Sequence, residues 1–264
     1  MNLRDLAITS LETITAFDIT TGNYKFTLDE LQNASISQSQ ESTDITGKGG
    51  RKLATIKRNK AVTISGSNGL VSGGLMEMQT GSKFVNAETE ILWSDYLTVN
   101  SNAATTTYTA VGTTGKEILA IYVQNADGTI SAELEQAAEA GSGKFAYVPG
   151  TKALTFSGIE DKTNIVVKYK RKVKADVLKD ASDKYSDKCT LYVDALAEDK
   201  CGNTYRVQFQ IPKADFSGEF SFEMGDNQSV HSFEAQALAG ACGTGGEFFS
   251  FIVFGANAAD VTGS

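Results

Sequence analysis

Proline, cysteine, histidine and tryptophan are all scarce in this chain. Its 264 residues include two prolines, three cysteines, one histidine and one tryptophan. Three cysteines do not make a paired disulfide framework, and a chain of this length buries a sizeable core without one. The opening stretch MNLRDLAITSLETITAF has no basic segment followed by an apolar run, so we expect no secretion signal. We expect the protein to be made in a reducing cytoplasm.

Long apolar runs and an excess of positive charge are also missing. No stretch approaches the roughly 18 apolar residues of a membrane-spanning helix, so we expect no contact with a membrane. The formal net charge is −8 and the isoelectric point is about 4.8. Because phosphate groups repel an acidic chain at long range, tight non-specific DNA binding is not expected.

The usual side chains of catalysis are too few for most enzyme mechanisms. A hydrolase triad needs a histidine beside an activated nucleophile, yet His231 lies in an alternating stretch that predicts a partly exposed strand residue. The spacing of Cys189, Cys201 and Cys242 includes no close pair of the kind that zinc sites use. Paired carboxylates leave a glycosidase open, although the single Trp93 offers little aromatic surface for a sugar. We expect no catalytic, cofactor or metal site.

Short segments with β-rich composition or period-2 alternation recur along the chain, and strands are expected near Tyr24–Leu28 and Lys52–Lys57 among others. In 167–174 the even positions are all lysine and the odd positions are mostly apolar, as in a strand with two unlike faces. On the order of a dozen or more such segments predict an all-β fold, an antiparallel sandwich or barrel. We expect one domain over residues 1–264, with an elaboration within 112–180.

One short flanking helix is predicted at about residues 70–80. Ser67 or Asn68 is placed to cap its start, and Gly81 is placed to end it. The segment Ser131–Ala140 also has a helix-prone composition, although it lacks an apolar stripe.

Two stretches carry a resemblance to a known family. The first is DITGKGGRKLATIKRNKAVTISGSNG from Asp44, which runs into the short helix. The second begins at Leu191, continues through DKCGNTYRVQFQIPKADFSG from Asp199, and ends with the apolar strand to Phe254. Together they cover less than half of the chain. They resemble the major tail tube proteins of long-tailed, siphophage-like bacteriophages.

The resemblance implies a structural virion protein. Its fold would be two packed antiparallel sheets with a flanking helix, and six copies would close a ring by joining their inner sheets around a lumen. Stacked rings would form a tube that conducts DNA from capsid to cell. The implied partners are further copies, a tape measure protein, a tail terminator and tail tip or baseplate proteins, with DNA passing non-specifically. The tubes of contractile tails and of secretion systems share this architecture.

Two basic features are candidate contact sites. A glycine-rich loop at about Gln40–Arg58 is predicted to be flexible and to contact the adjacent ring through charge-assisted bonds. Its candidate contact residues are Lys48, Gly49, Gly50, Arg51, Lys52 and Arg58. A second set of basic residues is expected on an exposed strand. These residues would either prevent edge-to-edge aggregation of the strand or pair with an acidic surface on a neighbouring copy. These residues are Lys168, Lys170, Lys172 and Lys174.

Two other functions stay open at this point. One is a capsid decoration protein or another structural virion protein. The other is a carbohydrate-binding β-sandwich, which aromatic side chains gathered on one exposed face would favour.

Overall fold

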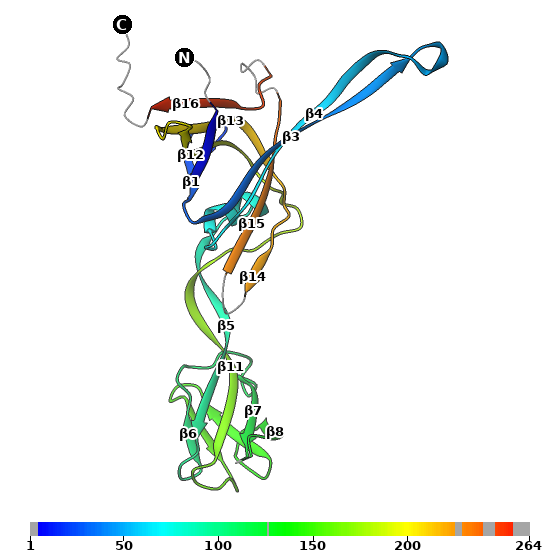
Figure 1. Ribbon diagram of the computed structural model, residues 1–264. Coiled ribbons are helices and arrows are strands. Elements are labelled where there is room, and N and C mark those ends of the chain that lie inside the picture. The colour runs from blue at the N-terminus through cyan, green and yellow to red at the C-terminus, as the bar shows by residue number, and fades with distance from the viewer. Residues whose placement is uncertain (1–4, 126, 225–228, 240–245, 256–264) are drawn as a thin grey trace. The chain divides into compact units, whose positions relative to one another are not determined.

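The computed structural model describes residues 5–125, 127–224, 229–239 and 246–255 (Figure 1). The chain divides into two compact units. Unit 1 comprises Met1–Phe84 and Leu178–Ser264, and unit 2 comprises Val85–Val177. Unit 2 begins earlier than the elaboration that we expected within 112–180, and the expectation of a single domain stays a prediction.

In its described residues, unit 1 has one nine-stranded antiparallel sheet and a single α-helix. Its strands are β1 (Leu6–Asp18), β2 (Tyr24–Leu28), β3 (Leu31–Thr46), β4 (Lys52–Asn68), β12 (Lys188–Asp199), β13 (Thr204–Phe216), β14 (Phe222–Met224), β15 (Ser229–Ala237) and β16 (Ser250–Gly255). The helix is α1 (Gly73–Thr80), and the short 3-10 turn η1 (Lys48–Gly50) joins β3 to β4. The predicted all-β class with one short helix is confirmed.

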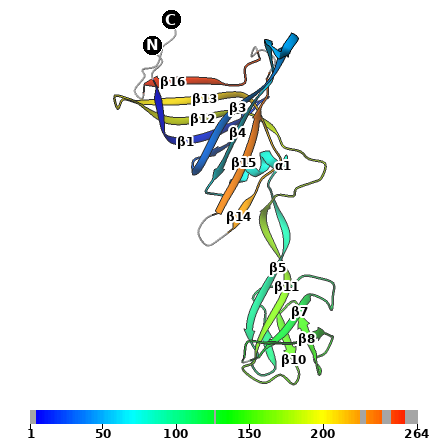
Figure 2. The same ribbon diagram turned by 45° about the vertical axis from the view of Figure 1, so that its right-hand side comes forward.

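Strand β13 divides this sheet into two halves. The main path runs β2-β1-β12-β13-β15-β4-β3, while β14 pairs with β15 and β16 pairs with β13 (Figure 2). Residues 205–210 of β13 pair with β16, whereas 214–216 pair with β15. Between them Pro212 lies where the register with β12 shifts. A proline lacks the N–H that a regular ladder needs, so it suits this bulge.

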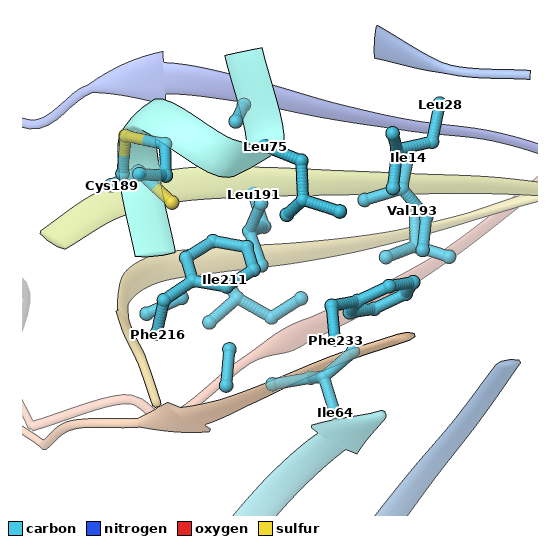
Figure 3. Packing of buried hydrophobic residues seen from close by; sticks show 14 of the residues in the cluster. Ile14, Leu28, Ile64, Leu75, Cys189, Leu191, Val193, Ile211, Phe216 and Phe233 are labelled. Carbon is cyan, nitrogen blue, oxygen red and sulfur yellow. The ribbon is translucent and has the colours of Figure 1, made fainter. Parts of the chain in front are cut away.

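The main core of unit 1 lies between the two halves. Leu191 and Val193 of β12 are buried in one cluster with Ile64 of β4 and Phe233 of β15, and Leu75 of α1 packs into the same cluster (Figure 3). Each such side chain contributes about 1.5–3 kcal/mol when it is fully buried. The two halves of the sheet are therefore held together mainly by this shared apolar layer.

Helix α1 begins later than the sequence predicts. Its cap is Ser72, whose Oγ accepts a hydrogen bond from the Leu75 N–H at 3.3 Å. The predicted caps Ser67 and Asn68 are wrong because both remain in β4, where they pair with β15. Strand pairing thus continues through residues whose side chains also suit a helix start.

Gly81 ends α1 as predicted. It adopts the left-handed conformation with a φ of 65°, and its N–H donates to the Glu77 carbonyl at 2.9 Å. A Cβ at this position would lie 2.0 Å from the carbonyl oxygen of Tyr185. Only glycine therefore fits both the backbone conformation and the close approach of the following chain.

Unit 2 holds a seven-stranded sheet in the order β5-β11-β7-β8-β9-β10-β6. Its strands are β5 (Val85–Thr98), β6 (Ala103–Thr105), β7 (Ile118–Gln124), β8 (Ile130–Gln136), β9 (Lys144–Val148), β10 (Ala153–Phe156) and β11 (Asn164–Val177). The pairing is antiparallel except between β8 and β9. The helix-prone segment Ser131–Ala140 does not form a helix. Most of it lies in β8, where pairing with β7 overrides the helix propensity.

Asp95 of β5 is a buried polar centre in unit 2. Its carboxylate accepts hydrogen bonds from the Tyr169 hydroxyl at 2.7 Å, the Trp93 indole at 2.9 Å and the Thr107 N–H at 2.7 Å. Although burial opposes ionisation, these donors together keep the pKa of Asp95 below its usual value. The carboxylate therefore ties β5 to β11 and to the loop after β6.

We predict that Gly81→Ala destabilises unit 1 by more than Gly22→Ala does. Both glycines have positive φ, 65° and 70°, so both variants lose about 1–2 kcal/mol through the left-handed backbone. A Cβ at Gly22 meets nothing within 4 Å, whereas one at Gly81 meets the Tyr185 backbone. Urea denaturation of both variants, followed by circular dichroism, measures the difference. Equal losses would contradict the role of the close approach.

Candidate functional site

The most distinctive surface of unit 1 is a long β-hairpin formed by the outer parts of β3 and β4. We call residues 39–61 the arm (Figure 1). The two strands stay paired up to Thr46 and Lys52, and the tip is the 3-10 turn η1. Every residue of the arm is exposed except Gly47, which is half-buried. The loop expected at about Gln40–Arg58 is instead two paired strands joined by a short turn, and the strand expected near Lys52–Lys57 lies in β4.

The arm has two unlike faces. On one face, Asp44 pairs with Lys52 at 2.7 Å and accepts a hydrogen bond from Thr55 at 2.8 Å. These two contacts lower the pKa of Asp44. On the other face, Ile45 lies opposite Ala54, and the next apolar side chain along β4 on this side is Ile56. The arm is therefore an amphipathic ribbon.

The structure brings the predicted contact residues together on this arm. Lys48, Gly49 and Gly50 form the tip, while Arg51 and Lys52 lead into β4. Arg58 lies further down β4, directly opposite Glu41. The arm has six basic and two acidic side chains, a net charge of +4 in a chain whose total is −8. The remainder of the chain therefore carries −12.

The lysine strand of unit 2 is exposed as the alternation predicts, but carboxylates of its own chain lie beside it. The four side chains are Lys168, Lys170, Lys172 and Lys174 of β11. Glu90 and Glu88 of β5 lie directly opposite the last two of these lysines. Lys170 Nζ lies 3.8 Å from a carboxylate oxygen of Glu90. Part of the positive charge is thus balanced within unit 2.

A row of polar side chains crosses the face of β1, β12 and β13 that points away from the core. Asp194 of β12 accepts a hydrogen bond from Gln208 of β13 at 2.8 Å and one from Thr13 of β1 at 3.4 Å. Gln210 in turn donates to Gln208 at 2.6 Å. We call these four residues the polar ladder. Sequence reasoning missed it, although the alternation of polar and apolar residues in β12 and β13 was its signal.

His231 is fully buried rather than partly exposed, so that expectation is wrong. Its Nδ1 accepts the Ser72 N–H at 3.3 Å, and its Nε2 lies 2.8 Å from the Gln79 side-chain oxygen. Because Nδ1 acts as an acceptor, the proton is on Nε2 and the ring is neutral. Burial lowers the pKa of His231. The ring thus joins both ends of α1 to β15.

The described residues contain no group of three or more His, Cys, Asp or Glu side chains arranged to hold a metal ion. Cys189 is buried, which raises the pKa of its thiol to about 12. Cys201 is exposed, and Cys242 lies outside the described residues. Across the same described residues, no helix has the length and apolar character that crossing a membrane requires.

The exposed amphipathic arm and the polar ladder are the distinctive surfaces of this all-β fold. The sequence matches the model of the YomU/Tube protein family over residues 6–250, so the chain belongs to this family. The match supports the identification as a phage tail tube protein, which the two sequence stretches had indicated. It therefore also supports a structural role in the virion. No curated protein matches the chain.

We predict that unit 1 loses stability as the pH falls below about 6.5, the ordinary pKa of histidine. The folded state disfavours protonation of His231, so below this value the unfolded chain binds more protons and unfolding is favoured. Above this pH, neutral His231 makes its full contribution to the free energy of unfolding. Protonation would also turn Nδ1 into a donor facing the Ser72 N–H.

The measurement is urea denaturation at about pH 7.5 and about pH 5.5, on either side of the histidine titration. The matched control is His231→Gln, which does not titrate and should show a smaller difference between the two conditions. Carboxylates such as Asp44 titrate at lower pH and affect both proteins alike. An identical pH dependence in both proteins would contradict the role of His231.

Proposed function

We propose that this chain is the repeating subunit of a hollow phage tail tube, in which six copies form a ring and rings stack. The observation that carries the proposal is a pair of open edges in the half-sheet β2-β1-β12-β13-β16 (Figure 2). At one end, the only described strand that pairs with residues 6–13 of β1 is β12. At the other end, β16 pairs only with β13 among the described strands. Joining β16 of one copy to β1 of the next would make a continuous barrel and remove both edges.

The polar ladder indicates which face of the half-sheet would line the lumen of this barrel. The opposite face of the half-sheet is buried in the core of unit 1, so the face with Asp194, Gln208 and Gln210 is the one free to line a lumen. Hydroxyl, amide and carboxylate groups offer DNA no cluster of cations to bind. DNA would therefore slide through such a tube without adhering.

The arm supports contact between successive rings, and the basic residues of its tip are the proposed contacts. The wider partners in this proposal are a tape measure protein in the lumen before ejection, a tail terminator, and tail tip or baseplate proteins. The lysine strand of unit 2 remains a candidate inter-subunit surface. The subunit would be made in the host cytoplasm and would act in the virion.

We predict that Arg51→Glu combined with Lys52→Glu blocks ring stacking while the monomer stays folded. Both side chains are exposed, so unit 1 loses little stability. Each exposed ion pair is worth under about 1 kcal/mol, but six copies repeat the loss around every proposed ring. Negative-stain electron microscopy of the concentrated protein, with preformed tail tips as initiators, should show tubes for the parent chain and not for the variant.

The matched control is Lys179→Glu with Lys184→Glu, which makes the same change in charge at exposed positions of unit 1 away from the arm. This control should still form tubes. Normal tubes from the Arg51 and Lys52 variant would count against the arm as a stacking contact. A parent chain that stays monomeric even with tail tips would count against the tube itself.

We predict that Asp194→Lys with Gln208→Lys produces tubes that retain linear DNA. The substitutions place cations on the face proposed to line the lumen, and their attraction for phosphate should weaken as salt rises. Co-sedimentation of tubes with linear DNA and with covalently closed circular DNA measures this. A closed circle cannot thread a tube, so equal retention of both forms would contradict a lumen position for the polar ladder.

A further inference from the structure

Unit 1 has an apolar groove on the side where β1 and β3 face each other. The groove has a volume of about 430 Å³. Its apolar lining includes Ile8 and Leu11 of β1, Leu31 and Ile36 of β3, and Val193 and Phe209 beneath them. Ile8 remains 58% exposed, so the lining is open to solvent. Leu11, Leu31 and Ile36 in this lining are only half-buried, so the groove exposes apolar surface beside the core.

The arm carries a set of apolar side chains that also lacks a partner. Ile45, Leu53 and Ile56 are 44%, 58% and 43% exposed. Among the described residues, the only strand that the arm pairs with is the other strand of the same hairpin. An isolated two-stranded hairpin is marginally stable in water, so its apolar face gains from being covered.

We infer that the apolar face of the arm docks into this groove on a second copy of the chain. This inference rests on the proposed tube, and it identifies the surface of the second copy that the arm binds. Branched side chains such as Ile45 and Ile56 are matched to an apolar lining, since covering both removes apolar surface from water. The occupant is a copy of this chain because the arm carries +4 and the rest of the chain −12.

Acidic side chains lie near the groove in the sequence, which adds to this complementarity. Glu30 is exposed directly before Leu31, and Glu12 follows Leu11 and is half-buried. The arm would present its basic residues to such carboxylates while its isoleucines enter the groove. Basic and acidic surfaces of this kind favour correct encounter and orientation more than they add affinity.

The arm and the groove are different patches of the same molecule, so their contact is head-to-tail. Each docked pair leaves one free groove and one free arm. Contacts of this type close into rings or continue as open helical assemblies. A stack of rings is an assembly of the second kind, which agrees with the proposed tube.

The test is disulfide cross-linking between two singly labelled full-length chains. One chain carries Ile56→Cys and a size tag, and the other carries Ile8→Cys, both in a background with Cys201→Ser and Cys242→Ser. The mixture is concentrated with tail tips and oxidised, and heterodimers are measured on a non-reducing gel. Electron microscopy of the same sample records whether tubes have formed.

The matched control replaces Ile56→Cys with Thr55→Cys, which lies on the opposite face of the arm beside Asp44. We expect several-fold more heterodimer with Ile56→Cys than with Thr55→Cys. Tubes in which the two labels cross-link equally, or not at all, would overturn the groove as the docking site and leave the tube standing. The absence of both tubes and cross-links would count against both proposals.

Discussion

The two-sided pairing of β13 is the constraint on which the rest of unit 1 depends. One edge of this strand pairs with β12, while its other edge is shared between β16 and β15. The irregularity at Pro212 lies between the two shared segments and lets the sheet change course there. As a result one half of the sheet faces the other across the core. The half with β16 ends in the open edges of β16 and β1, and the half with β15 ends in the hairpin of β3 and β4 that carries the arm.

The arm shows how a β-rich chain handles surface that it cannot bury alone. Within one copy, its ion pair between Lys52 and Asp44 satisfies the polar face, while the isoleucines of the other face stay in water. Such a surface is a liability in a monomer, because exposed apolar patches and strand edges invite uncontrolled association. In an assembly the same surface becomes specific, since charge and shape restrict what can cover it.

Local patterns in the sequence predicted local structure well. The expected strand Tyr24–Leu28 is β2, and Gly81 ends the helix because its position needs a left-handed backbone. The outer part of β3 was missed because it is rich in serine, glutamine and acidic residues, whose low β-propensity is overridden by pairing across the hairpin. The burial of His231 was missed because its partner Gln79 lies far away in the sequence, and the polar ladder was missed because its contacts depend on how β1, β12 and β13 pair.

The way in which unit 2 enters the chain has a consequence for how such proteins diversify. Its first and last residues, Val85 and Val177, are directly paired neighbours in β5 and β11. A segment that leaves and returns at one point can be gained, lost or exchanged by a single recombination event without re-routing the surrounding strands. Unit 2 thus has the architecture of an inserted domain, which can diverge in sequence at a different rate from the sheet of unit 1.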